Sequence, residues 1–325
     1  MTVVSAATRV LYVGGAGRSG STVLGQILGQ VPGFVHVGEL VFIWRRGVMD
    51  NQLCGCGQPF LDCPFWTEVG ERAFGGWTRD DANAAAAQQR RVERTRHIPA
   101  LLAPSLSSGY RAELAGYAER MHRLYDAIRD VSAGSVIVET SKAPSHALLL
   151  RRVRGLSLAV CLLVRDSRGV AYSWTRRKAR PEVAEETYMD IYSPQRAALE
   201  WTSFNAAFTM APALGVPLQR LRYEDFVAHP AREIRRLVDF AAGPLVALPD
   251  IFGGESVTLS PDHSVAGNPV RFASGQVALR SDDEWRTAMP RGQRVAMTAM
   301  TAPWLLRYGY LGGSGAAGQP KSRPR

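Results

Sequence analysis

Long apolar runs and the marks of export are missing from this chain of 325 residues. No run of 18 apolar residues occurs, so we predict no transmembrane segment. The N-terminus lacks a basic region before an apolar core, the pattern of a signal peptide. Only four cysteines are present. We therefore expect a cytoplasmic protein with reduced thiols.

Acidic residues are fewer than basic ones, 29 against 39, which gives a net charge of +10. Nucleic-acid binding is one explanation, but the arginines are spread widely and no aromatic-basic RNA motif occurs. A polyanionic cofactor and acidic substrates explain the sign equally well. We predict no nucleic-acid partner.

The segment from Arg9 to Leu24 predicts a phosphate-binding turn. Leu11–Val13 is a short apolar strand that ends in glycines, and Leu24, Ile27, Leu28 and Val31 form one apolar helix face. A strand, glycine-rich turn and helix in this order direct backbone N–H groups and the positive end of the helix dipole at an anion.

This turn differs from an ordinary nucleotide P-loop. Gly15, Gly20 and Thr22 fit the G-x-x-x-x-G-K-[ST] spacing, but Ser21 stands at the lysine position and Arg18 lies inside the loop. Because a P-loop kinase needs that lysine on its phosphates, the pattern favours another anion. A glycine turn that only packs is the alternative.

The turn resembles the 5′-phosphosulfate loop of sulfotransferases that use 3′-phosphoadenosine 5′-phosphosulfate (PAPS), in the form seen in carbohydrate and tyrosylprotein sulfotransferases. The resemblance implies that the cofactor's 5′-phosphosulfate is bound by Gly17, Arg18, Ser19, Gly20, Ser21 and Thr22.

Two further residues follow strands. Glu39 ends the short strand 34–37, and from position alone it is equally an acid–base residue or a helix cap. In related sulfotransferases a Gly-Glu pair follows the loop arginine at about this distance, here 21 positions, which implies that Glu39 is the general base. Lys142 follows strand 136–139 in a segment similar to the family's [NDS]-K-x-P, which implies contact with the sulfuryl group.

Three other segments resemble the nucleotide site of the family. Arg165 and Ser173 fit the 3′-phosphate pattern V-R-D-x-R-x-x-x-x-S after the apolar strand 158–164. Tyr223 lies in Arg-Tyr-Glu-Asp-Phe, similar to the R-Y-E-D-L segment, and is the candidate for stacking on adenine. Arg271, in the loop 262–272, is the candidate from a C-terminal segment that folds over the 3′-phosphate; His263 and Asn268 are weaker ones.

Cys54, Cys56 and Cys63 lie close together, whereas Cys161 lies inside an apolar strand. A structural zinc usually takes four ligands, so these three cysteines are one short. His36 is a possible fourth, although its spacing does not require it. Zinc, a disulfide and reduced structural thiols are all open; we predict reduced thiols and no metal.

Strands alternate with helices along the chain, which predicts a three-layer α/β, P-loop-like fold with a central parallel sheet. We expect one domain over 1–311, with a helical insert at about 78–131 that covers the acceptor pocket. A disordered basic tail, 312–325, follows.

The predicted function is transfer of a sulfuryl group from PAPS to an acceptor hydroxyl, with Glu39 as base, Arg18 and Lys142 stabilising charge, and no metal. The acceptor is a saccharide, glycolipid, peptide tyrosine or small metabolite. The alternatives are a P-loop-type nucleotide kinase or NTPase, and a non-catalytic binder of nucleotides or nucleic acid.

Overall fold

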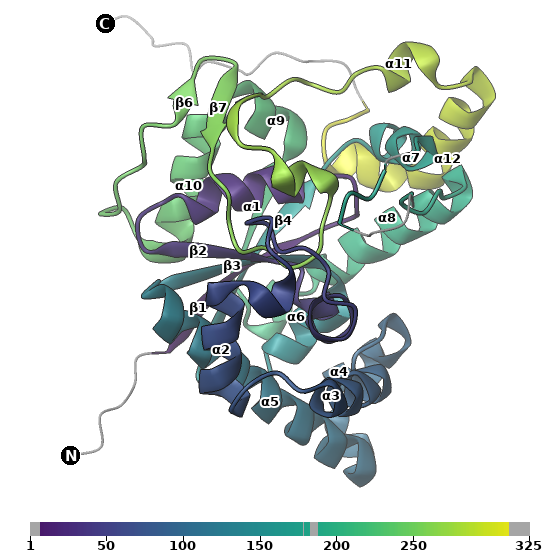
Figure 1. The fold of residues 1–325 in the computed structure, drawn as a ribbon. Coiled ribbons are helices and arrows are strands. Elements are labelled where there is room, and N and C mark those ends of the chain that lie inside the picture. The colour runs from purple at the N-terminus through teal and green to yellow at the C-terminus, as the bar shows by residue number, and fades with distance from the viewer. Residues whose placement is uncertain (1–6, 178, 183–187, 312–325) are drawn as a thin grey trace, which may run out of the picture.

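The computed structural model describes residues 7–177, 179–182 and 188–311. Its centre is a parallel five-stranded sheet with the order β2-β3-β1-β4-β5 (Figure 1). The strands are β1 (Thr8–Gly14), β2 (Phe34–Gly38), β3 (Val136–Lys142), β4 (Leu156–Val164) and β5 (Leu218–Arg222). The first four contain apolar runs, whereas β5 has the mixed sequence Leu-Gln-Arg-Leu-Arg. The predicted α/β fold is confirmed.

The position of β1 explains where the site forms. It pairs with β3 on one side and β4 on the other. The chain leaves β1 toward β2 and later crosses to the β4 side, so the carboxyl end of β1 is a topological switch point, where ligands bind in open α/β sheets.

Alternate side chains of β1 enter two different apolar cores. Val10 and Tyr12 pack in the first core, and Leu11 and Val13 pack in the second. This alternation follows from the period of two along a strand and produces a sheet buried on both faces.

Helices cover both faces and complete the three layers. The first core is covered by α5 (Ser108–Ser132), α6 (Pro144–Leu150) and α8 (Pro194–Thr209), and the second by α1 (Ser21–Gly29) and α10 (Pro230–Ala242).

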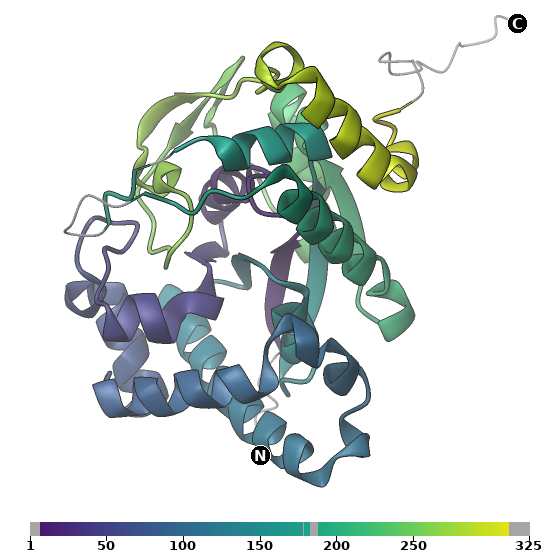
Figure 2. The same cartoon turned by 90° about the vertical axis from the view of Figure 1, so that its right-hand side faces the viewer.

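A helical segment lies between β2 and β3 and includes the range 78–131 of the predicted insert. It comprises α2 (Pro64–Phe74), α3 (Arg79–Val92), α4 (Ile98–Leu102) and α5. In Figure 2 these blue helices lie at the end of the molecule opposite the yellow helix α12 (Arg291–Arg307). The apolar side of α5, including Tyr117, Met121 and Tyr125, is fully buried in the first core.

The C-terminal part contains a small antiparallel sheet that the sequence patterns did not predict. Its strands are β6 (Phe252–Gly253), β7 (Ser256–Leu259) and β8 (Gly275–Ala278). The remaining helices are α7 (Ser167–Thr175), α9 (Tyr223–Ala228) and α11 (Trp285–Ala288). Helices α11 and α12 are separate because Met289, before Pro290, is extended.

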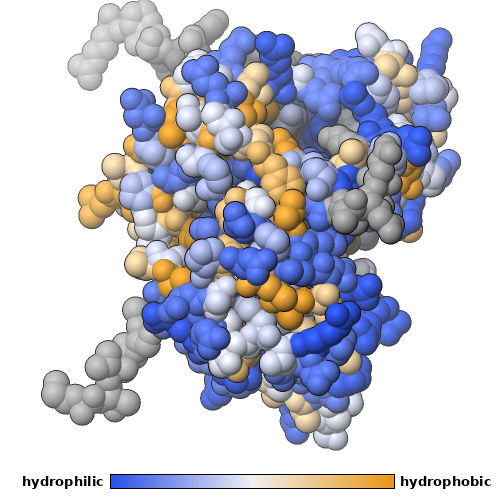
Figure 3. Space-filling model, viewed as in Figure 1, coloured by the Kyte–Doolittle hydropathy of each residue, from blue (hydrophilic) through white to orange (hydrophobic). Residues whose placement is uncertain are grey.

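None of the helices in the described ranges has the length and apolar character needed to cross a bilayer. On the face shown in Figure 3, hydrophobic residues are interspersed with hydrophilic ones. The predicted tail, 312–325, lies outside the described residues.

Candidate active site

The glycine-rich turn after β1 leads directly into the N-terminus of α1, as predicted. Gly20 is the N-cap with φ 88°, and a Cβ there would lie 2.8 Å from the ring of Tyr223. Gly15, at φ 129°, leaves no space for a Cβ beside the carbonyl oxygen of Leu163. No side chain caps α1, so its first N–H groups remain available to an anion.

Arg18 lies in this turn with its guanidinium 4.7 Å from the ring centre of Trp174. Its Nε, Nη1 and Nη2 atoms are buried, and no described residue bonds to them. The neighbouring Ser19 Oγ is also buried without a partner. Burial lowers the pKa of Arg18. Since an unpaired buried cation is costly, these orphaned donors fit an anionic group such as the 5′-phosphosulfate.

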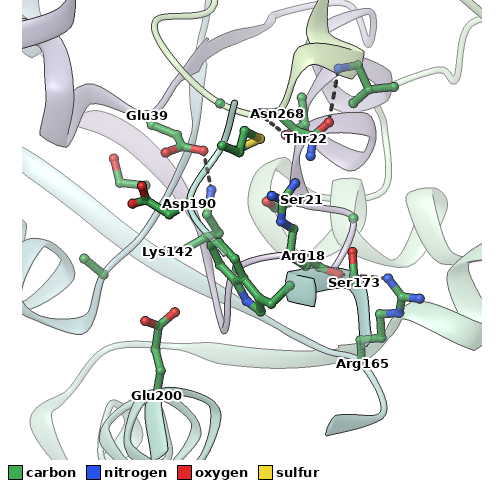
Figure 4. A pocket seen from close by; sticks show the side chains of 18 of the residues that line it. Arg18, Ser21, Thr22, Glu39, Lys142, Arg165, Ser173, Asp190, Glu200 and Asn268 are labelled. Carbon is green, nitrogen blue, oxygen red and sulfur yellow. Dashed lines mark hydrogen bonds and ion pairs between the residues drawn. The ribbon is translucent and has the colours of Figure 1, made fainter. Parts of the chain in front are cut away.

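Glu39 and Lys142 meet beside this turn. The parallel pairing of β2 with β3 brings their carboxyl ends together, and Lys142 lies opposite Gly14 of β1. Lys142 Nζ donates to Glu39 Oε1 at 2.5 Å and to the carbonyl oxygen of Thr140 at 2.9 Å (Figure 4). The backbone of Lys142 is left-handed, with φ 67°. The two predicted catalytic residues therefore form an ion pair.

The loop 262–272 contributes to the same place. The Val265 carbonyl accepts from the backbone N–H of Glu39 at 2.7 Å, and Asn268 N–H approaches Thr22 Oγ1 at 3.5 Å. This loop therefore fixes the backbone that carries Glu39 and lies beside the start of α1.

Arg165 leaves the end of β4 and reaches the turn from the other side. Its Nη1 donates to the carbonyl of Arg18 at 2.9 Å, and its Nη2 donates to Asp282 Oδ2 at 2.9 Å. Ser173, on α7, is buried and lines the cavity. The structure thus brings Arg165 and Ser173 to one cavity, but it places a carboxylate on the arginine that was predicted to hold a phosphate.

Tyr223 begins α9 and lies between Arg165 and the turn. The Arg165 guanidinium is 4.7 Å from its ring centre, and its hydroxyl donates to the carbonyl of Arg280 at 3.3 Å. The Tyr223 ring lines the cavity, so an adenine stacked on it would contact the same ring as the Arg165 guanidinium.

Arg271 is buried and bonds to two backbone carbonyls. It is 1% exposed, and its guanidinium donates to the carbonyls of Ser264 and Leu53 at 2.8 Å each. It therefore holds the loop 262–272 against the segment around residue 53. These bonds use Nη1 and Nη2, whereas Nε is buried without a described partner, so the contact of Arg271 with a 3′-phosphate stays a prediction.

A cavity of about 620 Å³ is lined by the predicted site residues Arg18, Glu39, Lys142, Arg165, Ser173 and Tyr223. Beyond the predicted residues, sequence reasoning missed two groups that line it. The aromatic and apolar group includes Phe42, Trp174, Met189, Tyr192 and Phe204, and the charged group includes Arg46, Arg180, Asp190, Glu200 and Asp282. Trp174 follows Ser173 of the predicted motif directly; the others lie in segments without a recognisable pattern.

The predicted cover over the cavity is wrong for the described residues. None of the residues lining the cavity lies in 78–131. Helix α5 instead turns its apolar side to the first core, and α3 reaches the site only indirectly, through Gln89 Nε2, which donates to the Val41 carbonyl at 2.9 Å. The cavity wall comes from 41–46 and from described residues between 180 and 204.

A buried ionic network, also missed, lies under Lys142. His146 of α6 contacts Glu93 Oε1 at 2.9 Å and Glu139 Oε1 at 3.0 Å, and all three side chains are fully buried. Burial alone would lower the pKa of His146, but the charges of Glu139 and Glu93 outweigh it and raise the pKa to about 10. Ser141 donates to Glu139 and accepts from the N–H of Val41 at 3.1 Å. The network therefore links α3 to both segments that carry the ion pair.

A model described as "Sulfotransferase family" matches residues 11–245. No curated protein matches the chain. Among solved structures, the chain is similar to "Sulfotransferase Domain from the Curacin Biosynthetic Pathway", at 17% identity over 90% of this chain and 96% of that chain, with a TM-score of 0.46. It is also similar to "Sulfotransferase Domain from the Synechococcus PCC 7002 Olefin Synthase", at 16% identity over 91% and 94%, with a TM-score of 0.48.

Proposed function

The chain belongs to the sulfotransferase family, and we propose that it transfers a sulfuryl group from PAPS to the hydroxyl of an acceptor. The observation that carries the proposal is Arg18, whose three guanidinium nitrogens are buried without a described partner at the open N-terminus of α1. A sulfuryl or phosphate oxygen would supply the missing acceptors.

PAPS supplies the activated sulfuryl group, and the residues of this chain bind it and handle the proton. Backbone N–H groups from Gly17 to Thr22, with Arg18, bind the phosphosulfate. Arg165 and Ser173 bind the 3′-phosphate, and Tyr223 lies against the adenine. Asp282, now on Arg165, has to share or give up that guanidinium.

Glu39 takes the proton of the acceptor hydroxyl while the acceptor oxygen bonds to sulfur and the bond from sulfur to the phosphate oxygen breaks. The contact with Lys142 gives this proton transfer a second consequence. When Glu39 becomes neutral, the Lys142 ammonium loses its counter-charge, and it is then free to stabilise the negative charge on the departing phosphate oxygen. Arginine and lysine supply the positive charge, so the proposed transfer uses no metal.

The part of the cavity wall formed by residues outside the predicted nucleotide site is the proposed acceptor side. It combines Phe42, Met189 and Phe204 with the charged residues Arg46 and Glu200. Such a wall suits an acceptor with an apolar body and polar groups, and saccharides, glycolipids, peptide tyrosines and small metabolites all stay open. The proposal further includes a cytoplasmic location, one domain over 1–311 and no nucleic-acid partner.

An acceptor screen with ³⁵S-labelled PAPS tests the proposal. We expect label in at least one hydroxyl acceptor, with the rate strongly reduced by Arg18→Ala and unaffected by added magnesium. Arg176→Ala is the matched control, because Arg176 is half-exposed and pairs with Glu284. Magnesium-dependent ATP turnover without label transfer would instead favour a nucleotide kinase or NTPase.

A further inference from the structure

Three cysteines and a histidine from distant parts of the chain converge outside the cavity. They are Cys54, Cys56, Cys63 and His263. Their three sulfurs and one ring nitrogen all lie within 4.8 Å of one another. His36, a possible fourth ligand from the sequence, instead pairs with Asp262 at 2.6 Å.

The separations match a tetrahedral zinc site. With Zn–S of about 2.3 Å and Zn–N of about 2.05 Å, tetrahedral geometry requires about 3.8 Å between two sulfurs and about 3.6 Å between sulfur and nitrogen. Cys56 and Cys63 are 3.7 Å apart, and His263 Nδ1 lies 3.3 Å from Cys63 and 3.9 Å from Cys54. We propose that these four residues form a Cys₃His structural zinc site, a proposal independent of the proposed transfer.

The surrounding structure holds each ligand in place. The Cys54 carbonyl accepts from Gly57 N–H at 2.8 Å, which closes a tight turn around the Cys-x-Cys pair, and Cys63 is the N-cap of α2. The His263 ring stacks on Phe65 with ring centres 4.8 Å apart and planes inclined by 6°. Its carbonyl accepts from Trp66 Nε1 at 2.8 Å. Such outer contacts orient metal ligands.

A disulfide would explain the positions of fewer of these four side chains than a zinc ion does. All four cysteines are free, and the Cys56–Cys63 separation of 3.7 Å exceeds the roughly 2.05 Å of a disulfide bond. A disulfide between Cys56 and Cys63 would also leave the positions of Cys54 and His263 beside them unexplained. Zinc uses all four side chains, and a site with four protein ligands is closed, as structural zinc sites are.

The zinc would connect the site to the rest of the fold. It joins the segment 54–63 to the loop 262–268, in which Val265 accepts from Glu39 N–H and Asn268 approaches Thr22. Gly55 N–H also donates to the Ser264 carbonyl at 3.0 Å. The structural role of the proposed zinc is to hold the loop 262–268 beside the anion-binding turn. The zinc takes no part in the sulfuryl transfer.

The first test is the metal content of the full chain, purified without chelator and measured by mass spectrometry. We expect about one zinc per chain in the wild type and in Cys161→Ser, whose cysteine is buried in β4 away from the cluster. Cys54→Ser and Cys63→Ser should lose it. His263→Cys should keep it as a Cys₄ site, whereas His263→Ala should bind it more weakly.

A second test uses the wild type alone and stays informative if the variants fail to fold. Replacing zinc with cobalt should give the visible d–d bands of tetrahedral Co²⁺ and a thiolate charge-transfer band, and removing the metal should lower the melting temperature. Wild-type protein that holds no zinc and gives no tetrahedral cobalt spectrum would overturn the site. So would an intact Cys56–Cys63 disulfide in protein handled under reducing conditions.

Discussion

Arg18 holds its backbone in the left-handed region, at φ 66°, and its buried guanidinium lacks any described hydrogen-bond partner. Each feature costs free energy, on the order of 1–3 kcal/mol for the backbone conformation alone. Packing on Trp174 returns part of that cost through a cation–π contact. An anion bound in the turn would offset the rest of this free-energy cost by accepting hydrogen bonds from the guanidinium. Ligand binding is therefore coupled to the local strain at Arg18.

Glu39→Gln tests the base. The amide keeps the shape but accepts no proton, so turnover should fall by about 10²–10⁴, with affinity for adenosine 3′,5′-diphosphate nearly unchanged. If Glu39 only caps a helix, turnover should stay near normal and stability should fall by about 1 kcal/mol or less. Product formation and melting temperature measured on one preparation separate these outcomes, with the exposed Glu71→Gln as control.

Arg165→Ala tests the 3′-phosphate site. Loss of a charge-assisted contact costs about 1.5–3 kcal/mol, so affinity for adenosine 3′,5′-diphosphate should fall roughly 10- to 150-fold. Affinity for adenosine 5′-phosphate should barely change. Calorimetric titration of both ligands checks this, and an equal loss for both would remove Arg165 from the assignment.

Asp282→Asn tests the carboxylate that lies on Arg165. A phosphate bound there would meet this like charge, and the repulsion is worth about 1 kcal/mol at ~4 Å even with the dielectric screening of bulk water. The substitution should therefore tighten adenosine 3′,5′-diphosphate by roughly fivefold and leave adenosine 5′-phosphate alone. Weaker diphosphate binding in the variant would mean that Asp282 orients Arg165 for its ligand.

At the scale of elements, the sequence predicted what depends on local pattern. Four of the five sheet strands contain apolar runs. Arg18, Glu39 and Arg165 follow strands and Lys142 ends one, so parallel pairing brings them to one edge of the sheet. The Glu93–His146–Glu139 network and the Asp282 contact could not be predicted, since they join segments far apart in sequence. The strands β6 to β8 have only two to four residues, too short for an alternating pattern to be recognised.

The His146 network predicts how stability depends on pH. In the folded protein the pKa of His146 is about 10, above the ordinary histidine value of 6.5. Its contribution to stability is therefore fully present below pH 6.5 and is lost as the pH rises through 10. Glu93→Gln removes one of the two charges that raise this pKa.

The fall of the melting temperature at alkaline pH should therefore begin at lower pH in Glu93→Gln than in the wild type. Melting curves from pH 6 to 10.5 measure this, with His122→Asn as a control outside the network. Coincident profiles for wild type and Glu93→Gln would show that the histidine does not carry the charge.

At the scale of the molecule, most of the net positive charge lies on residues outside the cavity. The described residues that line the cavity include five cationic side chains, namely Arg18, Arg46, Lys142, Arg165 and Arg180. They also include four carboxylates, namely Glu39, Asp190, Glu200 and Asp282. The cavity is thus nearly balanced, and most of the +10 lies elsewhere. Ligand binding should depend on these few partners, whereas the outer charge acts on any polyanion and is screened within about 10 Å at 0.1 M salt.

Removing residues 312–325 separates ligand binding in the cavity from the attraction of polyanions to the outer charge. The segment carries Lys321, Arg323 and Arg325 and no acidic residue, so its loss lowers the net charge from +10 to +7. Because its composition is rich in glycine, serine and proline, we expect the shortened chain to keep its melting temperature and its affinity for adenosine 3′,5′-diphosphate. Weak association with DNA at low salt should decline, since fewer counterions are released. Filter binding and calorimetry at 0.05 and 0.2 M salt check both. A loss of diphosphate affinity on truncation would show instead that the segment takes part in the site.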